Sequence, residues 1–325
     1  MGYAAYDPAP TRDHILTLNA GKSFPYTVYS TSIATDSSGV QVGVSDPDKA
    51  RRLARRSNGP ASEQALSATT PNVPITFTKG ALVEGAAWRD VKWHDTTPFI
   101  GGDVITDGNE YCSAGLPAIR NSDGATVMVT ADHCFKNGAQ VYTGNGTPGA
   151  LTGSTGNWVG QRTSATQEFD AEILVGTNNN ADESDTDGWK PLTRYAYSYN
   201  GDYVCQDGGA SFFDYHNAGT SPTPCNIKVA NEDVTWKMND AYGTEHDTRG
   251  VKGQNTSSSN SKYAVCQGDS GGTVFTAVNS DWSASAREAR GIVSAQDGAP
   301  CSTNIYWTEA TDIFNRLGLH LNPTT

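Results

Sequence analysis

The sequence predicts a mainly β protein, either a β-sandwich or a pair of β-barrels, with a small α+β segment in front of it. Glycine (34 residues) and tyrosine (14 residues) are plentiful in the 325-residue chain, and only 18% of the residues are charged. That composition is typical of short strands joined by polar turns. From residue 99 onward, short apolar and β-branched runs alternate with turn residues, and no long helical period interrupts them.

The first 80 residues predict a β-hairpin, a helix and a third strand. Strands are expected over 26–32, 40–44 and 73–78, and a helix over 47–57. Residues 36–39 suit the hairpin turn, and Asp46 followed by Pro47 suits the start of the helix. Arginine pairs at 51–52 and 55–56 fit a processing site or, as we favour, a solvated basic face.

The remainder of the chain predicts many strands, three polar loops and one late helix. Strands are expected at 125–130, 140–143, 171–175, 195–199, 226–229, 234–238, 273–276 and 291–295, and loops at 143–156, 177–188 and 254–261. The second loop is acidic, and we favour a solvated loop over a calcium site because it lacks EF-hand spacing. The helix is expected to begin at a Thr308 cap and to end at Gly318.

Charge and cysteine content limit the partners and the compartment. The net charge of -12 argues against nucleic acid or an anionic membrane as partner, and no apolar run approaches the roughly 18 residues that span a bilayer. Six cysteines without C-x-x-C spacing disfavour a metal site and predict disulfides, with several pairings open. We therefore expect a secreted protein, although residues 1–6 show no export signal, which is either missing from this chain or unusual.

One hydroxyl group stands among three glycines in the stretch Gly268-Asp269-Ser270-Gly271-Gly272. Glycines let a backbone approach another molecule closely, so Ser270 is a candidate nucleophile with N–H groups aimed at its target. A serine hydroxyl also needs a base that accepts its proton. By itself, the stretch is better explained as a turn between strands.

A candidate base and a candidate carboxylate lie upstream. The apolar run 127–130 leads into His133, and the neighbouring Cys134 can fix its position covalently. Asp170 stands at the mouth of the apolar run 171–175, where a carboxylate must be paired or capped. A carboxylate beside a histidine fixes its tautomer. Taken singly, however, each of the two residues also fits a structural role.

Together, residues 130–134, 169–174 and 268–272 resemble, in this order, the histidine, aspartate and serine motifs of chymotrypsin-fold serine proteases. The cysteine layout most resembles the bacterial branch that includes streptogrisins and α-lytic protease. The resemblance covers about residues 99–321. It implies two six-stranded antiparallel Greek-key β-barrels, at about 99–190 and 191–321, followed by a C-terminal helix.

The resemblance also implies the catalytic roles. Ser270 would be the nucleophile, His133 the general acid and base, and Asp170 the group that orients it. The N–H groups of Gly268 and Ser270 would form the oxyanion hole. The expected substrates are polypeptides, and the expected enzyme is a monomer without cofactor or metal.

The disulfides and the specificity pocket follow from the same resemblance. The implied disulfides are Cys112–Cys134, Cys205–Cys225 and Cys266–Cys301. Ser294 would donate to the Asp170 carboxylate and begin the strand along which a substrate pairs. Ala264, Gln296 and Asn304 would line the pocket. Because position 264 carries no carboxylate, we expect a small or medium uncharged substrate side chain there rather than Arg or Lys.

Two positions depart from the family pattern. Asp132 stands where the family usually has Gly or Ala, and we expect it to point to solvent; the alternative is that it raises the pKa of His133. Gln206 stands where the bacterial branch has an arginine that pairs with the carboxylate before the nucleophile, here Asp269. The counter-ion of Asp269 stays open among Arg120, Arg162 and Arg194.

Residues 1–80 resemble, more weakly, the pro-region modules that precede bacterial proteases of this branch. We expect a folding or inhibitory module, as in a zymogen, joined by a linker at 81–98. Two other functions fit parts of the pattern. The α/β-hydrolases also use G-x-S-x-G, but their residue order and strand–helix alternation do not match this chain. The other is a protease-like secreted binding protein without activity.

Overall fold

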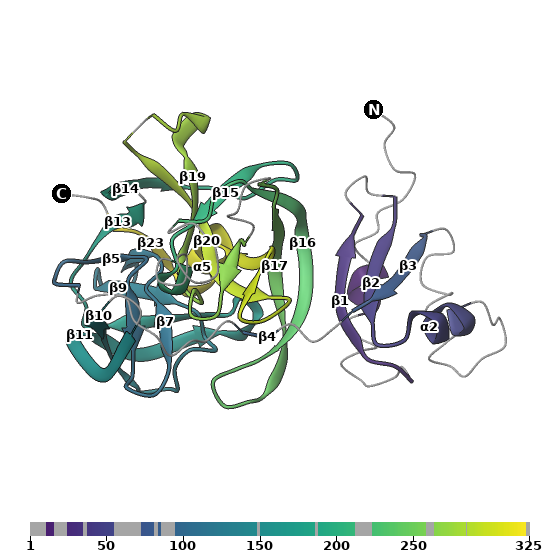
Figure 1. Cartoon of the computed structure of the whole chain (residues 1–325), viewed down its shortest axis with the longest axis horizontal. Coiled ribbons are helices and arrows are strands. Elements are labelled where there is room, and N and C mark those ends of the chain that lie inside the picture. The colour runs from purple at the N-terminus through teal and green to yellow at the C-terminus, as the bar shows by residue number, and fades with distance from the viewer. Residues whose placement is uncertain are drawn as a thin grey trace.

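The computed structural model describes residues 11–15, 25–34, 38–54, 73–80, 84–85, 95–147, 150–185, 188–211, 223–257, 263–283 and 285–322. These residues form a large body of curled sheets and, beside it, a small N-terminal sheet with a helix at 47–54 and a short helical stretch at 11–15 (Figure 1). None of the helices in these ranges is long and apolar enough to cross a membrane.

The first barrel is a closed ring of antiparallel strands. It contains β6 (Val104–Thr106), β7 (Tyr111–Ser113), β8 (Pro117–Arg120), β9 (Thr126–Thr130), β10 (Gln140–Thr147), β11 (Ala150–Thr166) and β12 (Ala171–Val175). Pairing runs in the order β8-β9-β12-β11-β10-β6-β7. Only residues 114–116 separate β7 from β8, so the two act as one bent strand that closes the ring. Along β9, Val127 and Val129 enter one apolar cluster and Met128 enters another, so this strand is buried on both faces.

The second barrel closes in the same way. It contains β15 (Tyr203–Gln206), β16 (Ile227–Asn239), β17 (Glu245–Asn255), β19 (Thr273–Ala277), β20 (Arg287–Gln296) and β22 (Asn304–Glu309). Antiparallel pairing runs β15-β16-β17-β22-β20-β19 and returns to β15. Val204, Val251 and Trp307 belong to its apolar core.

The two barrels share one topology. In each ring the first three strands are neighbours, and the fourth strand returns to pair with the first, which is the Greek-key order. The prediction of two six-stranded antiparallel Greek-key barrels is therefore confirmed. In both cases the barrel removes the sheet edges that an open sheet would leave unpaired.

The N-terminal part is an extension of the second barrel. Its elements are β1 (Val28–Ile33), β2 (Val40–Val44), α2 (Pro47–Ala54) and β3 (Ile75–Lys79). The hairpin and the helix lie where the sequence predicts them, and the Asp46 carboxylate caps the helix by accepting the Lys49 N–H at 2.9 Å. β1 pairs antiparallel with β16, with Thr31 opposite Thr235, so one sheet runs from this part into the barrel. Predicted helix residues 55–57 lie outside the described residues.

The remaining elements connect or close the barrels. They are β4 (Glu84–Gly85), β5 (Phe99–Gly101), η1 (Gln167–Phe169), β13 (Asn179–Asp185), β14 (Gly188–Tyr195), β18 (Val265–Cys266), η2 (Val278–Ser280), β21 (Cys301–Ser302), α5 (Ala310–Leu317) and β23 (Leu319–Leu321). β4 pairs antiparallel with the end of β20. α5 follows the second barrel, and β23 then pairs with β8 of the first barrel, which ties the two barrels together.

Four local predictions are wrong. The stretches 143–156 and 177–188 form β-hairpins instead of loops, apart from 148–149 and 186–187, which are not described. Backbone groups make these ladders, so polar and glycine-rich residues suffice. The strand predicted at 195–199 ends at Tyr195, since the Ser198 N–H donates to the Glu309 carboxylate instead of to a strand. Thr308 is still paired in β22, and α5 begins after Glu309.

Candidate active site

His133 lies in the turn that follows β9. The Cys134 N–H donates to the Ala131 carbonyl at 3.1 Å, which closes the turn, and a disulfide joins Cys134 to Cys112 on β7. The histidine is 9% exposed. A hydrogen-bonded turn and a disulfide to β7 therefore hold the backbone that carries the imidazole.

Asp170 faces this imidazole from the residue before β12. Its backbone is left-handed, with φ 40°, where η1 ends. The carboxylate Oδ2 lies 2.8 Å from His133 Nδ1, and Oδ1 accepts the His133 N–H at 3.0 Å. The Ser294 hydroxyl donates to Oδ2 at 2.6 Å. Because a carboxylate only accepts, Nδ1 carries the proton and Nε2 is left as the acceptor.

Ser270 completes the chain of hydrogen bonds from the second barrel. Its Oγ lies 2.8 Å from His133 Nε2, across 137 residues of sequence. The Ser113 N–H donates to the Ser270 carbonyl at 2.7 Å, and the Ser113 hydroxyl donates to the Gly268 carbonyl at 2.8 Å. Gly268 has φ 101° and Gly271 has φ 86°, conformations that L side chains rarely adopt. The turn around Ser270 therefore depends on its glycines and on a residue of the first barrel.

The surroundings raise the pKa of His133 above the ordinary value of 6.5. Burial favours the neutral ring, but the Asp170 carboxylate and its hydrogen bond outweigh burial, and Asp132 adds to their effect. A histidine must be neutral to accept a proton. The ring is therefore ready to act as a base only at a pH above this raised pKa.

Asp132 is buried, so our expectation that it points to solvent is wrong. Its side chain is 4% exposed, and its Oδ1 lies 2.6 Å from Arg162 Nη2. The Arg162 Nε donates to Glu172 at 2.8 Å, so one guanidinium serves two carboxylates. Burial raises the pKa of Asp132, and Asp170 adds to it while Arg162 opposes it. Burial also raises the pKa of Glu172 well above its ordinary value, again against Arg162.

None of the three candidate arginines reaches Asp269. Arg120 pairs with Asp123, Arg194 with Glu288, and Arg162 with the two carboxylates just described. Instead, the Asp269 carboxylate accepts from the Ser211 N–H at 2.7 Å, the Cys266 N–H at 2.7 Å, the Gln206 amide at 3.0 Å and the Ser211 hydroxyl. Asp269 makes no ion pair with any residue in the described ranges.

The expected pocket residues come together where β17, β20 and β22 meet. Gln296 pairs with Ile305 in the ladder between β20 and β22, and the Ala264 N–H donates to the Ser302 carbonyl at 2.7 Å. The Gln296 amide donates to the Pro300 carbonyl at 3.2 Å, while its buried Oε1 has no hydrogen-bond partner among the described residues. Asn304 turns its amide to Asp297, at 2.8 Å.

The disulfides are the three pairs that the resemblance implies, Cys112–Cys134, Cys205–Cys225 and Cys266–Cys301. The last one joins β18, just before Ser270, to β21, just before Asn304. Cys112, His133 and Cys134 lie close enough to hold a metal ion. Both sulfurs are used in a disulfide and Nδ1 faces Asp170, so this group does not fit a metal.

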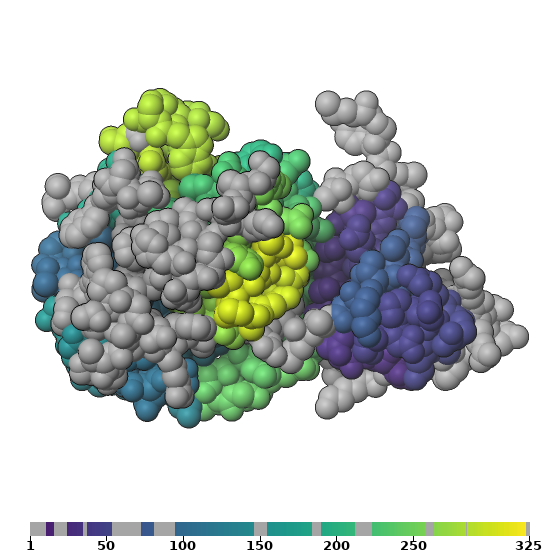
Figure 2. Space-filling view, viewed as in Figure 1, coloured from purple at the N-terminus to yellow at the C-terminus, as the bar shows by residue number. Residues whose placement is uncertain are grey.

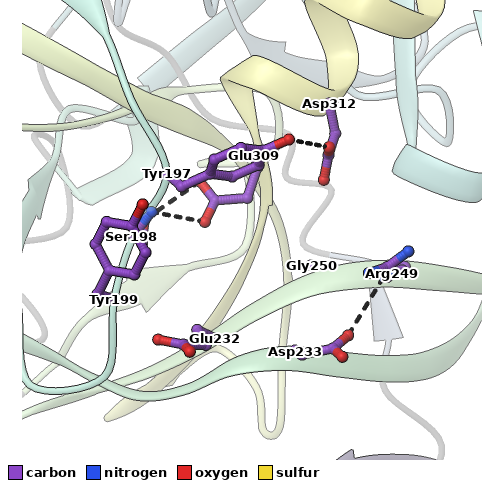
Figure 3. Close-up of a pocket in the computed structure, with 9 residues that line it drawn as sticks. All are labelled: Tyr197, Ser198, Tyr199, Glu232, Asp233, Arg249, Gly250, Glu309 and Asp312. Atoms are coloured by element: carbon purple, nitrogen blue, oxygen red, sulfur yellow. Dashed lines mark hydrogen bonds and ion pairs between the residues drawn. The ribbon is translucent and has the colours of Figure 1, made fainter. Parts of the chain in front are cut away.

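A hollow of about 240 Å³ lies between β16, β17 and the start of α5 (Figure 3). Tyr197 donates to Asp312 at 2.8 Å, and Ser198 donates through its N–H to Glu309 at 2.8 Å. Burial raises the pKa of Glu309 to about 8, while the Ser198 hydrogen bonds oppose it. No histidine is among the described residues that line this hollow, so Ser198 lacks the base that Ser270 has.

Sequence reasoning missed several residues that hold the site. Ser113 anchors the serine turn, Ser211 binds Asp269, and Asp297 binds both Asn304 and the Ser302 hydroxyl, the latter at 2.6 Å. Arg162 was expected only as a partner of Asp269. A usable signal existed only for Arg162, because a buried strand residue such as Glu172 requires a cation or a proton.

Comparison with known proteins gives structural matches alone. No family model matches the chain, and no curated protein does. Among solved structures, Nocardiopsis protease matches at 19% identity with a TM-score of 0.45, covering 69% of this chain and 98% of that chain. A glutamic acid specific serine protease matches at 21% identity with a TM-score of 0.48, covering 69% of this chain and 100% of that chain. Thermobifida fusca protease A matches at 18% identity with a TM-score of 0.46, covering 69% of this chain and 98% of that chain.

Proposed function

We propose that this protein is a secreted serine endopeptidase that hydrolyses peptide bonds through an acyl-enzyme intermediate. The observation that carries the proposal is the continuous chain of hydrogen bonds from Asp170 through His133 to Ser270, at 2.8 Å in each step. A carboxylate, a base and a hydroxyl in this order are what activates a serine. His133 and Asp170 belong to the first barrel and Ser270 to the second, so the three side chains meet through the fold and not because they are close in sequence.

The proposed cycle uses each group at a stated atom. His133 Nε2 accepts the proton of Ser270 as Oγ attacks the carbonyl carbon of the substrate, and it then gives this proton to the leaving amine. Water, activated by the same nitrogen, attacks the acyl-enzyme and releases the acid. Asp170 keeps the proton on Nδ1 and stabilises the imidazolium that forms in both halves. No cofactor takes part in these steps.

Two features support an oxyanion hole and a binding strand. The left-handed Gly268 and the Ser113 hydrogen bonds fix the backbone around Ser270, whose N–H and that of Gly268 would bind the oxyanion. At the end of β20, the stretch 294–296 begins with Ser294, whose hydroxyl donates to the Asp170 carboxylate. A substrate in extended form would pair with this stretch.

We further propose an uncharged, small or medium side chain for the main specificity pocket. Ala264 supplies no carboxylate, and Gln296 is 3% exposed with an amide that can donate and accept. Asp297 already binds Ser302 and Asn304. A peptide library varied at this position tests the point, and strict cleavage after Arg or Lys would contradict it.

Residues 1–80 are proposed to be a folding or inhibitory module, 81–98 its linker, and 99–321 the peptidase domain. The module lies against the second barrel (Figure 2), where β1 adds a strand to β16. Within the linker, Gly85 of β4 pairs with Ala295 and Glu84 with Gln296. This is the stretch of β20 that a substrate would occupy, so the linker would compete with the substrate.

The test of the function is hydrolysis of peptides by the purified, disulfide-intact chain. We expect Ser270→Ala and His133→Ala to lower the rate by at least about 10⁴-fold, because the serine loses its nucleophile or its base. Ser283→Ala is the matched control, since this exposed hydroxyl donates to the nearby Asp281 and should leave the rate unchanged. Equal rates for all variants would contradict the proposal.

The test of the module compares the full chain with one that begins at Pro98. We expect the shorter chain to refold from denaturant more slowly, because non-local β topology forms slowly without a template. Once folded, it should cleave long peptides faster than the full chain with an intact linker. If the shorter chain refolds and cleaves as well as the full chain, the module has neither role.

A further inference from the structure

Gln206 is the last residue of β15 and lies directly behind the serine turn. It is 0% exposed and pairs with Val274 of β19, a few residues after Ser270. The preceding Cys205 is bonded to Cys225, and the Gln206 N–H donates to the Pro224 carbonyl at 3.0 Å. The backbone of Gln206 is therefore fixed by these bonds, and its side chain lies in the interior of the protein.

The Gln206 amide connects four groups. Its Nε2 lies 3.0 Å from the Asp269 carboxylate, 2.9 Å from the Ser211 hydroxyl and 3.1 Å from the Ala264 carbonyl. Its Oε1 accepts the Gly208 N–H at 2.5 Å. The orientation of the amide is thus determined, since a flipped amide would place its oxygen against a carboxylate and its NH₂ against an N–H donor.

All four donors to Asp269 are neutral. They are two backbone N–H groups, from Ser211 and Cys266, one amide and one hydroxyl. Burial raises the pKa of Asp269, and these hydrogen bonds, led by that of the Ser211 hydroxyl, oppose the effect. A cation here would compensate the charge as well as donate. Neutral donors orient the carboxylate but do not neutralise its charge. Because a buried carboxylate that loses a hydrogen bond is costly, its position depends on keeping every one of them.

We propose that Gln206 and Ser211 are positioning residues that hold Asp269, and with it the oxyanion turn at 268–270, in place of a cation. The inference rests on the proposed function. Asp269 lies between the two residues whose N–H groups would bind the oxyanion, so a shift of its side chain turns both of them. Through the Ala264 carbonyl, the same amide also links this turn to the base of the specificity pocket.

The four neutral donors to Asp269, which we call its cradle, are all in place while the N-terminal module is present. The structure that contains β1–β3 and β4 also contains all four hydrogen bonds to Asp269. Formation of the oxyanion turn therefore needs no newly freed amino terminus. Inhibition by the module, where it occurs, would act by covering β20 and not by disordering the serine turn.

The test replaces Gln206 with glutamate, which has the same shape. At neutral pH a second carboxylate would face Asp269, and we expect kcat to fall by about 10²-fold, in the range known for loss of an oxyanion donor, with a smaller change in KM. As the pH falls, the new carboxyl group of the Gln206→Glu variant takes up a proton and can donate again. We therefore expect the ratio of Gln206→Glu to wild-type kcat to rise, by up to about tenfold per pH unit.

The other titratable groups near the cradle are the same in both proteins. Asp207 follows Gln206 and lies against Gly102, Asp103 follows Gly102, and His133 lies across Ser270. Their titration cancels in the ratio. Gln140→Glu is the matched control, because this exposed side chain accepts from Trp158 on the barrel surface and should give a ratio that does not change with pH.

The outcomes separate the inference from the proposed function. A fluorophosphonate that labels Ser270 in wild type shows that the function stands; no labelling of the folded wild type refutes the function itself. With labelling established, a ratio that is constant between pH 8 and 5 overturns the inference. If Gln206→Glu does not fold, Ser211→Ala decides, since a lowered kcat with a near-normal KM supports the inference and a wild-type kcat overturns it.

Discussion

Two buried carboxylates lie next in sequence to His133 and Ser270, and the protein compensates their charges in different ways. Asp132, in the first barrel, lies 2.6 Å from the Arg162 guanidinium. Asp269, in the second barrel, receives hydrogen bonds from neutral donors. Burial raises the pKa of both. Asp132 adds to the raised pKa of His133, whereas we propose that Asp269 holds the backbone that carries Ser270.

Among changes to these buried carboxylates and their partners, the largest effect on the rate is expected from Asp269→Asn. The amide cannot accept from all four neutral donors, and one of its own N–H groups would oppose them. We expect kcat to fall by about 10²–10³-fold, as for a lost oxyanion donor. Asp123→Asn is the control, because this carboxylate is half exposed and pairs only with Arg120 among charged residues of the described ranges. Steady-state kinetics at one pH suffice, and an unchanged kcat would show that the cradle has no catalytic task.

A smaller catalytic effect but a large loss of stability is expected from Arg162→Met. Two buried carboxylates would lose their cation, which typically costs about 3–5 kcal/mol. Because the folded-state pKa values of Asp132 and Glu172 are already raised, each takes up a proton more readily in the folded chain. Stability of the variant should therefore fall as the pH rises above the ordinary carboxyl range.

Urea unfolding between pH 5 and 8 measures this loss. Arg194→Met is the matched control: Arg194 is 46% exposed and pairs with Glu288, so its loss should cost no more than about 1 kcal/mol. Equal losses for the two variants would mean that the ion pairs of the first barrel contribute no more than a surface pair.

Asp132→Asn should change the pH profile and leave the maximum rate nearly intact. Asp132 is one of the groups that raise the pKa of His133, after Asp170. Removing its charge lowers the His133 pKa, so the ring stays neutral to lower pH and the acid limb of kcat/KM moves down. We expect a shift of less than about one pH unit, because the Asp170 contribution remains. A limb that stays in place would show that Arg162 cancels the charge of Asp132 completely.

Glu309 extends the comparison to a buried carboxylate that is not among the proposed catalytic groups, and its replacement should not alter activity. Its pKa is about 8 in the folded chain, against an ordinary 4.5. Between these values the folded chain binds the extra proton, so stability declines as the pH rises, by at most about 1.4 kcal/mol per unit. Glu309→Gln should remove this part of the slope. Thermal unfolding at pH 5, 6.5 and 8 measures it, and an unchanged slope would contradict the raised pKa.

The sequence predicts the barrels, and it names three residues that the structure joins by hydrogen bonds, because both depend on local signals. Apolar alternation locates β9, β12 and β19, and the motifs around His133, Asp170 and Ser270 lie at the ends of those strands. The long hairpins β10–β11 and β13–β14 could not be found in this way. Their strands are polar and glycine-rich, and backbone pairing that does not bury apolar side chains leaves no periodic signal.

The surroundings of the site could not be predicted, since they depend on contacts between distant segments. The buried Asp132 carboxylate is paired with Arg162, which lies thirty positions later in the sequence. The neutral donors to Asp269 come from two segments that are far apart in sequence: Gln206 and Ser211 on one, and Cys266 on the segment that carries Asp269 itself. A sequence shows that a carboxylate needs partners, but a fold decides whether they are cations or neutral donors.

The most direct test of the central claim is labelling of Ser270 by a fluorophosphonate, measured as intact mass and located by peptide mapping. We predict one label per folded chain, on Ser270, and no label on Ser270→Ala or His133→Ala, because the reaction needs the hydroxyl and the base that accepts its proton. Wild-type protein with its three disulfides intact that takes up no label would contradict the account and would favour a protease-like binding protein without activity.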